Sequence, residues 1–249
     1  MAKEIDAGGV TQGVSRQLWK AIVRVLQAAD GEPASLRLLD CGGGSGSLAV
    51  PLAGLGAHVT VVDISVDALG TLVRRATEAG VADRIVAVQG EIENLDVLLA
   101  GQRFQVVFAH EVLESCADID AVLGQVRSVL LPGGTVSILV RNRAAVVLGR
   151  VLVGDVQGAV RLVGGHSAAA EPVTSSITLA TLVDICRRSD LEPLLAEGIG
   201  VFTDLVRGAE LDRPGATVAL DQLEELTCDQ APYRDIAARL HLLARWNAS

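Results

Sequence analysis

The chain has 249 residues, half of which are hydrophobic, and its formal net charge is −9. A chain of this length and apolar content can bury a substantial core, so we expect one domain over residues 1–249. The negative charge argues against a broad nucleic-acid surface, which needs clustered cations. Pro51 and six glycines interrupt the uncharged run 41–62, which excludes it as a membrane span.

The first residues lack the apolar core of a secretory signal, which favours a cytoplasmic protein with no membrane partner. The cysteines are Cys41, Cys116, Cys186 and Cys228. They form no C-x-x-C pair, and no histidine stands near them at the spacing of zinc ligands. We therefore expect buried free thiols and no metal site.

Residues 11–29 carry Leu18, Ile22, Val25 and Leu26 at helical spacing, which predicts a helix ahead of the first strand. We expect the segment 1–30 to form an N-terminal lid. Trp19 and Trp246 are interpreted as packing residues.

A strand over 36–41 runs into a turn with glycines at Gly42, Gly44 and Gly46. Glycine tolerates positive φ and lets a ligand approach the main-chain N–H groups at the start of the next helix. The spacing is G-x-G-x-G, whereas a dinucleotide fingerprint would have glycine or alanine in place of Ser47. A tight strand–helix connection without a ligand is the alternative.

The next strand, 58–63, ends at Asp63, whose carboxylate is placed to accept hydrogen bonds from a ribose diol. Asp63 could instead cap the following helix, but Ser65 suits that position better. The helix after Ser65 ends at Gly80, and a third strand covers 85–88.

A fourth strand, 104–109, leads into His110 at its carboxyl end, where open α/β sheets place ligands. His110 either lines a pocket or is a hydrogen-bonded structural histidine. A helix over 119–130, a turn at 132–134 and a strand over 135–140 follow. This alternation predicts a doubly wound, mostly parallel α/β sheet.

After residue 140 the alternation pauses, and we expect an insertion at 141–176 over the acceptor side of the site. The stretch 141–165 is basic, because it holds four arginines and one acid, Asp155. A helix over 179–188, a strand near 193–198, and a helical stretch and a last strand at 241–244 complete the pattern. The four arginines are Arg141, Arg143, Arg150 and Arg161.

These elements and motifs resemble the class I S-adenosylmethionine-dependent methyltransferases, with their Rossmann-like fold, over nearly the whole chain. Several strings resemble one subgroup, the tRNA 5-carboxymethoxyuridine methyltransferases. They are Gly9-Val10-Thr11-Gln12-Gly13-Val14-Ser15-Arg16, His110-x-Val112-Leu113-Glu114, Leu131-Pro132-Gly133-Gly134, Asn142, Gly198-x-x-Val201-Phe202-x-Asp204-x-x-Arg207, Cys228-x-Gln230-x-Pro232-Tyr233, Arg239 and His241.

The resemblance implies S-adenosylmethionine as cofactor and a set of residues around it. The three glycines would pass beneath the methionyl and ribose parts, Asp63 would hold the ribose, Glu91 would accept from the adenine amine, and Arg16 would pair the cofactor's carboxylate. For Glu91 and Arg16 a solvated surface position is the alternative. The full cofactor set is Arg16, Asp40, Gly42, Gly44, Gly46, Asp63, Ile64, Glu91, Ile92 and His110.

The same resemblance implies Asn142, Arg207, Tyr233 and His110 as catalytic candidates. Methyl transfer needs a nucleophile held in line with the S–CH3 bond. A carboxylate acceptor needs a neighbouring cation, which we expect from Arg141, Arg207 or Arg239, whereas a hydroxyl acceptor would use His110 as base. Tyr233 either stacks on a substrate base or packs.

Two departures weaken the tRNA assignment, because the subgroup carries an arginine in place of Gly200 and an aromatic residue in place of Ser115. The acceptor is therefore either a modified tRNA uridine or a small anionic molecule. An inactive, cofactor-binding regulator is the third hypothesis.

Overall fold

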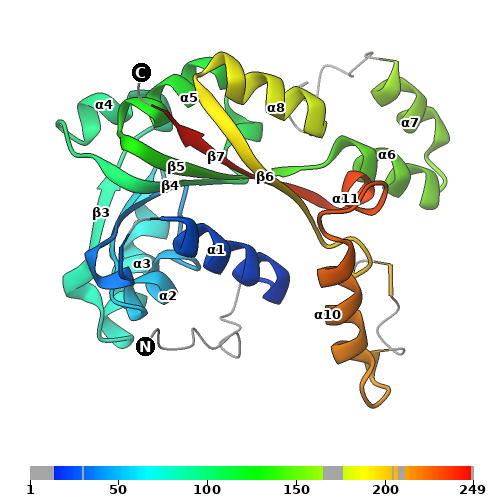
Figure 1. The fold of residues 1–249 in the computed structure, drawn as a ribbon, viewed down its shortest axis with the longest axis horizontal. Coiled ribbons are helices and arrows are strands. Elements are labelled where there is room, and N and C mark those ends of the chain that lie inside the picture. The colour runs from blue at the N-terminus through cyan, green and yellow to red at the C-terminus, as the bar shows by residue number, and fades with distance from the viewer. Residues whose placement is uncertain (1–13, 30, 165–175, 204, 207–210, 248–249) are drawn as a thin grey trace.

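A computed structural model describes residues 14–29, 31–164, 176–203, 205–206 and 211–247. Seven strands form one sheet in the order β3-β2-β1-β4-β5-β7-β6 (Figure 1). Strands β1 to β5 pair in parallel, and β7 runs antiparallel to both β5 and β6. The expected doubly wound, mostly parallel sheet is confirmed. The strands are β1 (Arg37–Cys41), β2 (His58–Asp63), β3 (Ile85–Gln89), β4 (Phe104–His110), β5 (Leu130–Arg141), β6 (Leu191–Ile199) and β7 (Arg239–Trp246).

Helices cover both faces of the sheet, and each face has its own apolar layer. The first layer joins α1, α2 and α3 to the sheet, and the second joins α4, α5 and α8 to it. These helices are α1 (Arg16–Ala28), α2 (Ala49–Gly54), α3 (Val66–Glu78), α4 (Leu95–Leu98), α5 (Ile119–Ser128) and α8 (Leu179–Arg188). Trp19 is buried in the first layer and Trp246 packs against the second, as expected for packing residues.

Helix starts follow local capping chemistry. The side chain of Ser15 accepts from the N–H of Leu18 at the start of α1, and Ser65 accepts from Ala68 at the start of α3, both at 3.2 Å. Apolar residues at helical spacing turn one side of α1 toward the sheet, where Ile22 and Val25 are fully buried. The N-terminal helix is therefore part of the core, and its role as a lid stays a prediction.

The start of β5 differs from the sequence-based expectation. We expected a helix to residue 130, a turn at 132–134 and a strand from 135, but α5 ends at Ser128 and β5 already begins at Leu130. The Pro-Gly-Gly segment lies within the strand, where the pairing with β4 shifts register between Phe104 and Val106. The glycines accommodate this irregularity, since Gly133 has φ +78°.

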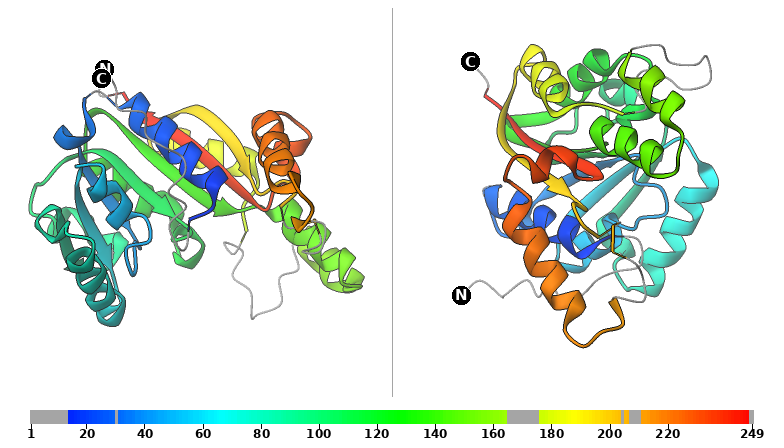
Figure 2. Two further views of the ribbon diagram at one scale, coloured as in Figure 1. Left: turned by 90° about the horizontal axis from the view of Figure 1, so that it is seen from below. Right: turned by 90° about the vertical axis from the view of Figure 1, so that its right-hand side faces the viewer.

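Among the described residues, four more helices gather at the end of the sheet where β5 terminates (Figure 1). They are α6 (Arg143–Leu152) and α7 (Val156–Val163) in the expected insertion, with α10 (Ala216–Thr227) and α11 (Tyr233–Ile236). Helix α7 projects from the body of the molecule (Figure 2). Within the described ranges, none of the helices is both long and apolar enough to cross a bilayer.

The cysteines match the expectation of free thiols, with one difference in burial. Cys41, Cys116 and Cys186 are buried, whereas Cys228 is half-buried. Cys228 lies just beyond α10, where the chain passes from the surface back to the sheet.

Candidate functional site

The glycine turn after β1 has the conformation that its sequence predicts. Gly42, Gly44 and Gly46 all have positive φ, at +69°, +52° and +78°. A Cβ added to Gly46 would lie 2.3 Å from the Leu72 side chain of α3, so the close approach of the turn to this helix also requires glycine. The turn thus leaves main-chain groups exposed at the carboxyl edge of the sheet, between β1 and α3.

Asp63 ties this turn to the end of β2. Its Oδ2 accepts from the N–H of Gly44 and its Oδ1 from the N–H of Ser65, both at 2.8 Å. The carboxylate is half-buried, and each oxygen keeps a further lone pair for a ligand. The next side chain, Ile64, is 70% exposed, which offers an apolar surface beside the carboxylate.

Asp40 is the most unusual carboxyl group near the turn. It is buried, and its Oδ2 has no hydrogen-bond partner among the described residues. Burial, with a smaller contribution from Asp63, raises the pKa of Asp40 to about 7. A Cβ on Gly43 would lie 2.4 Å from Oδ2, so the turn packs directly on this carboxyl. A buried acid in need of a partner, beneath a glycine turn, fits a ligand that brings positive charge, as a sulfonium cofactor with an amino group does.

The other predicted cofactor contacts differ in their burial and in their present partners. Glu91 is exposed and accepts from the Asn94 amide at 3.4 Å, whereas Ile92 is buried in the core layer beneath it. Arg16 forms an ion pair with Asp221 of α10 at 2.7 Å. Binding of a cofactor carboxylate by Arg16 would therefore compete with Asp221, and this role stays a prediction.

His110 ends β4 with one ring nitrogen already bonded, since its Nε2 lies 2.8 Å from the Ser137 hydroxyl of β5. Burial, and secondarily His241, lowers the pKa of His110 to about 3, so the ring is neutral. The next residue, Glu111, has φ +53° and pairs with Arg239. Strained backbone of this kind clusters at functional sites.

The acceptor-side candidates are only partly brought together. Asn142 is buried, and its amide donates to the carbonyls of Asp235 and Ala237 at 2.9 and 2.8 Å while its oxygen caps α6. Both of its hydrogens are thus used to hold α11 against α6. Tyr233 is partly exposed, and its ring lies 5.9 Å from that of Phe202.

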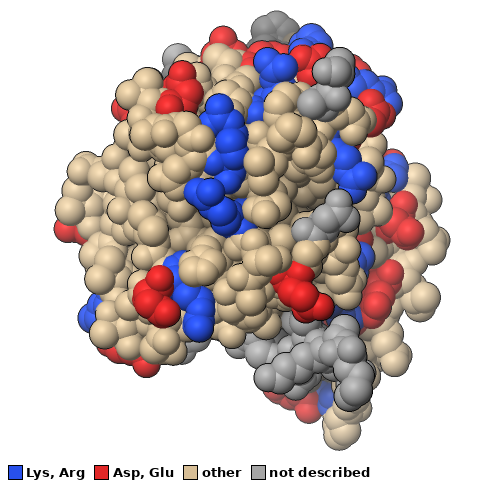
Figure 3. Space-filling model, turned by 60° about the vertical axis from the view of Figure 1, so that its left-hand side comes forward, with Lys and Arg blue, Asp and Glu red and all other residues tan. Residues whose placement is uncertain are grey.

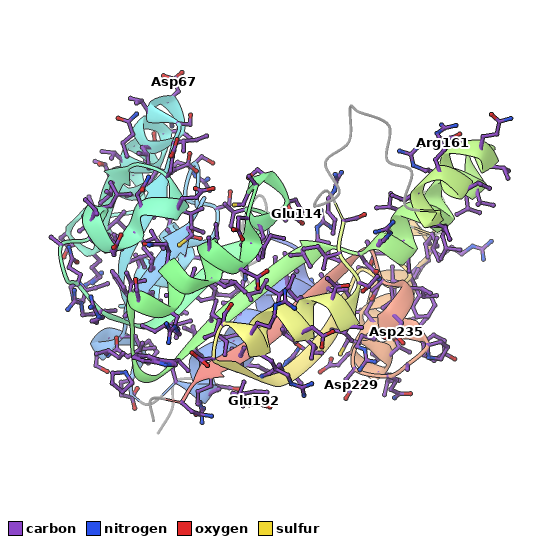
Figure 4. The ribbon with its side chains drawn as sticks, turned by 90° about the horizontal axis from the view of Figure 1, so that it is seen from above. Asp67, Glu114, Arg161, Glu192, Asp229 and Asp235 are labelled. Carbon is purple, nitrogen blue, oxygen red and sulfur yellow. The ribbon has the colours of Figure 1, made fainter. Side chains whose placement is uncertain are left out.

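The remaining acceptor-side candidates are the arginines Arg207 and Arg141. Arg207 lies outside the described residues. Arg141 ends β5, and its main-chain N–H donates to Glu114 at 2.6 Å. Burial raises the pKa of Glu114, and the charge of Arg141 acts in the opposite direction. In the view of Figure 4, Glu114 lies between Asp67 in the first turn of α3 and Arg161 on α7.

Three polar residues that belong to this region were not singled out from the sequence. Ser137 and Glu197 join the two histidines of the sheet, as described below. Glu224 of α10 is buried and accepts from the N–H groups of the 201–203 loop at 2.8–2.9 Å, which positions Phe202 against Tyr233. The available signal was an isolated polar residue between apolar neighbours, as in Val136-Ser137-Ile138.

Comparison with known proteins agrees with this geometry. Residues 33–151 match the model of a methyltransferase domain family. The chain is 29% identical, over 95% of its length and 90% of the relative's, to the tRNA 5-carboxymethoxyuridine methyltransferase of Escherichia coli K12. It is 33% identical to a ubiquinone biosynthesis O-methyltransferase of Chelativorans sp. strain BNC1, over 48% of this chain and 46% of that one.

The fold is that of a solved structure with S-adenosylhomocysteine bound. Magnesium protoporphyrin IX methyltransferase from Synechocystis PCC 6803 superposes with a TM-score of 0.59 at 17% identity, covering 92% of this chain and 82% of that one. The glycine turn and the acid at the end of β2 both lie within the matched residues 33–151. Residues 33–151 therefore form a methyltransferase domain, and the protein is an S-adenosylmethionine-dependent methyltransferase.

Proposed function

We propose that the protein methylates the carboxylate of a modified tRNA uridine such as 5-carboxymethoxyuridine. The observation that carries this proposal is the extent of the similarity. The E. coli relative matches over 95% of the chain, including the acceptor-side segments after residue 151, whereas the Chelativorans relative matches over only 48%. A cytoplasmic location is part of the proposal, because tRNA is its substrate.

Bound S-adenosylmethionine would supply an electrophilic methyl group, and the protein would have to position the acceptor oxygen in line with it. A carboxylate is already ionised at neutral pH, so it needs a cation and exclusion of water and no strong base. The neutral His110 is consistent with this requirement. Arg141 at the end of β5 is one candidate for this cation, and its charge also acts on the neighbouring Glu114.

The proposal is tested by an in vitro assay on tRNA that carries 5-carboxymethoxyuridine, with mass spectrometry of the nucleosides. We expect a mass increase of one methyl group at that nucleoside. Single alanine variants of Arg141, Arg207 and Arg239 then locate the cation. Loss of the pocket arginine should cost about 2–5 kcal/mol in transition-state binding and leave cofactor affinity nearly unchanged. Parent-like turnover by all three variants would contradict carboxylate methylation.

A second candidate, O-methylation of a small hydroxyl compound, is favoured by Gly200. This residue has φ +72°, a conformation that an arginine would adopt only with strain. The position that carries arginine in the tRNA subgroup is therefore occupied by a residue without charge. Turnover of a neutral hydroxyl compound, with none of the modified tRNA, would establish this alternative.

A further inference from the structure

A line of polar side chains crosses four adjacent strands on the face that α1 covers. Ser137, His241 and Glu197 are buried there, on β5, β7 and β6, and His110 is half-buried at the end of β4. Residues two positions away on three of these strands belong to the apolar layer of α1, which places the four polar side chains on that face. Those neighbours are Phe108, Leu243 and Leu195.

These side chains form one continuous hydrogen-bonded chain, here called the His110–Glu197 chain. His110 Nε2 lies 2.8 Å from Ser137 Oγ, and Ser137 Oγ lies 2.9 Å from His241 Nε2. His241 Nδ1 lies 3.3 Å from Glu197 Oε2, and the other oxygen of Glu197 pairs with Arg24 at 2.6 Å. The chain thus connects the carboxyl end of β4, where the acceptor is expected, to an ion pair under α1.

The far end of the chain borders a small cavity between α1, β6 and α10. Its volume is about 20 Å³, enough for about one water molecule. Arg24 and Cys228 line it, and the Cys228 thiol lies 3.9 Å from Glu197. The His110–Glu197 chain therefore runs from the half-buried His110 at one end to this cavity at the other.

The directions of the hydrogen bonds follow from an ionised Glu197 together with a neutral His241 in the resting protein. Burial raises the pKa of this carboxyl, but the hydrogen bond from His241 and the charge of Arg24 outweigh burial and hold the pKa below its usual value. An ionised carboxylate only accepts, so His241 Nδ1 must donate. In a neutral His241, Nε2 then accepts from the Ser137 hydroxyl, which in turn accepts from His110 Nε2–H. His110 is left with a lone pair on Nδ1.

One added proton reverses the two hydrogen bonds that Ser137 makes with His110 and His241, and every hydrogen bond of the His110–Glu197 chain stays in place. A proton that arrives at His110 Nδ1 lets Nε2 release its hydrogen to Ser137, and the Ser137 hydroxyl hydrogen passes to His241 Nε2. Each O–H or N–H bond that breaks is replaced by one that forms. The result is a neutral His110 that donates from Nδ1 and a charged His241 that faces the Glu197 carboxylate.

We propose that the His110–Glu197 chain couples the binding of an anionic acceptor to the uptake of one proton. The resting protein presents a lone pair at His110 Nδ1, which repels a carboxylate. With the anion bound, Nδ1 presents a hydrogen to it, and the positive charge resides on His241 between Ser137 and Glu197. This inference rests on the proposed function, because the acceptor's negative charge is what draws in the proton.

The coupling predicts the sign of a pH dependence. Over the pH range in which binding takes up one proton, acceptor affinity should fall about tenfold per pH unit, because the proton that must accompany each binding event becomes scarcer. Asp40, whose pKa is raised to about 7, is a further titratable group on β1, the strand next to β4, beside the cofactor turn. The ionisable groups along or beside the chain are Arg24 on α1, His110 on β4, Glu197 on β6, Glu224 on α10, Cys228, and the Glu111–Arg239 pair at the strand ends.

The resting chain is tested first, without acceptor, by ¹⁵N NMR of the histidine rings in the whole protein. At neutral pH we expect hydrogen on Nε2 of His110 and on Nδ1 of His241. Ser137→Ala should release the fixed tautomer of His110. Thr135→Val removes a hydroxyl from the same face of the same strand, outside the chain, and should change neither ring. Hydrogen on Nδ1 of the resting His110 would overturn the proposal.

The coupling is tested by calorimetric titration of the cofactor-product complex with the nucleoside 5-carboxymethoxyuridine, in buffers of different ionisation enthalpy. We expect uptake of about one proton by the parent and by Thr135→Val, and much less by Ser137→Ala. Any contribution of Asp40 is common to all three proteins and cancels in the comparison.

Two outcomes separate the failure of the coupling from the failure of the proposed function. Binding with equal proton uptake in the parent and Ser137→Ala overturns the coupling and leaves the acceptor assignment intact. Binding of a neutral hydroxyl nucleoside, with no binding of the carboxylate, overturns both.

Discussion

Asp63 is the residue whose contribution to cofactor binding is most directly measurable. Its oxygens hold Gly44 and Ser65 and keep lone pairs for a ribose diol. Asp63→Ala should weaken the binding of S-adenosylhomocysteine by about 1.5–3 kcal/mol, which is the range for hydrogen bonds to a charged group. Calorimetry measures this change. Asp67→Ala, in the exposed first turn of α3, is the matched control. Unchanged affinity in the Asp63 variant would remove this residue from the site.

Asp40 makes stability depend on pH in the direction opposite to that of most carboxyls. Its pKa is raised from 3.8 to about 7, so the folded state binds more protons than the unfolded state between these values. Its contribution to stability is therefore full below pH 4 and is lost as pH rises to about 7. Asp40→Asn should raise the free energy of unfolding at pH 8, by up to about 4 kcal/mol, and leave it unchanged at pH 4. Denaturant titrations at both pH values decide this, and equal effects at both would contradict it.

At the scale of elements, α3 and the turn beside it hold glycines with opposite requirements. Gly70 lies within α3 with open space where a Cβ would stand, whereas Gly46 has positive φ and abuts Leu72. Gly70→Ala should stabilise the protein by about 0.5–1 kcal/mol. Gly46→Ala should destabilise the protein by about 1–3 kcal/mol and weaken cofactor binding, because the turn must move to make room for the added Cβ. Thermal unfolding with and without S-adenosylhomocysteine measures both effects, and a stabilising Gly46→Ala would refute the close approach.

The α6–α7 segment is expected to move when the acceptor binds. No residue of α6 is buried, and Leu152 and Val153 are 74% and 81% exposed. Few buried contacts predict fast local opening, so amides of α6 and α7 should exchange faster than those of β4 and β5 and slow down with acceptor bound. Exchange as slow as in the central strands, without acceptor, would exclude a lid over the acceptor side.

At the scale of the whole molecule, a charge of −9 opposes tRNA binding and leaves local cations to provide it. The face in Figure 3 is mostly uncharged, with a run of basic side chains in its upper middle and acidic and basic side chains side by side elsewhere. In the α6–α7 segment Arg150 pairs with Asp155, whereas Arg161 lies on the projecting helix. Affinity for tRNA should therefore fall steeply with salt. Arg161→Ala should reduce the slope of log K against log salt by about 1, and Arg74→Ala, on α3, should not. Equal slopes in both variants would place the tRNA elsewhere.

Most elements, and the local geometry of the turn and acid that we predict to hold the cofactor, could be read from the sequence. The glycine turn and Asp63 were predictable because their geometry depends on local backbone conformation and on the order of strand, turn and helix. The exact ends of elements were harder, as at Leu130, because pairing with β4 extends β5 through a segment whose residues favour a turn.

The hydrogen bonds that join the polar residues of the sheet depend on tertiary packing and could not be predicted from the sequence. His110, Ser137, His241, Glu197 and Arg24 lie on five elements separated by up to 217 residues, and no local pattern relates them. They meet because β7 inserts antiparallel between β5 and β6, which brings His241 between Ser137 and Glu197. The same packing decided that Asn142 holds α11 and that Arg16 pairs with Asp221, since hydrogen-bond partners distant in the chain are chosen by the fold.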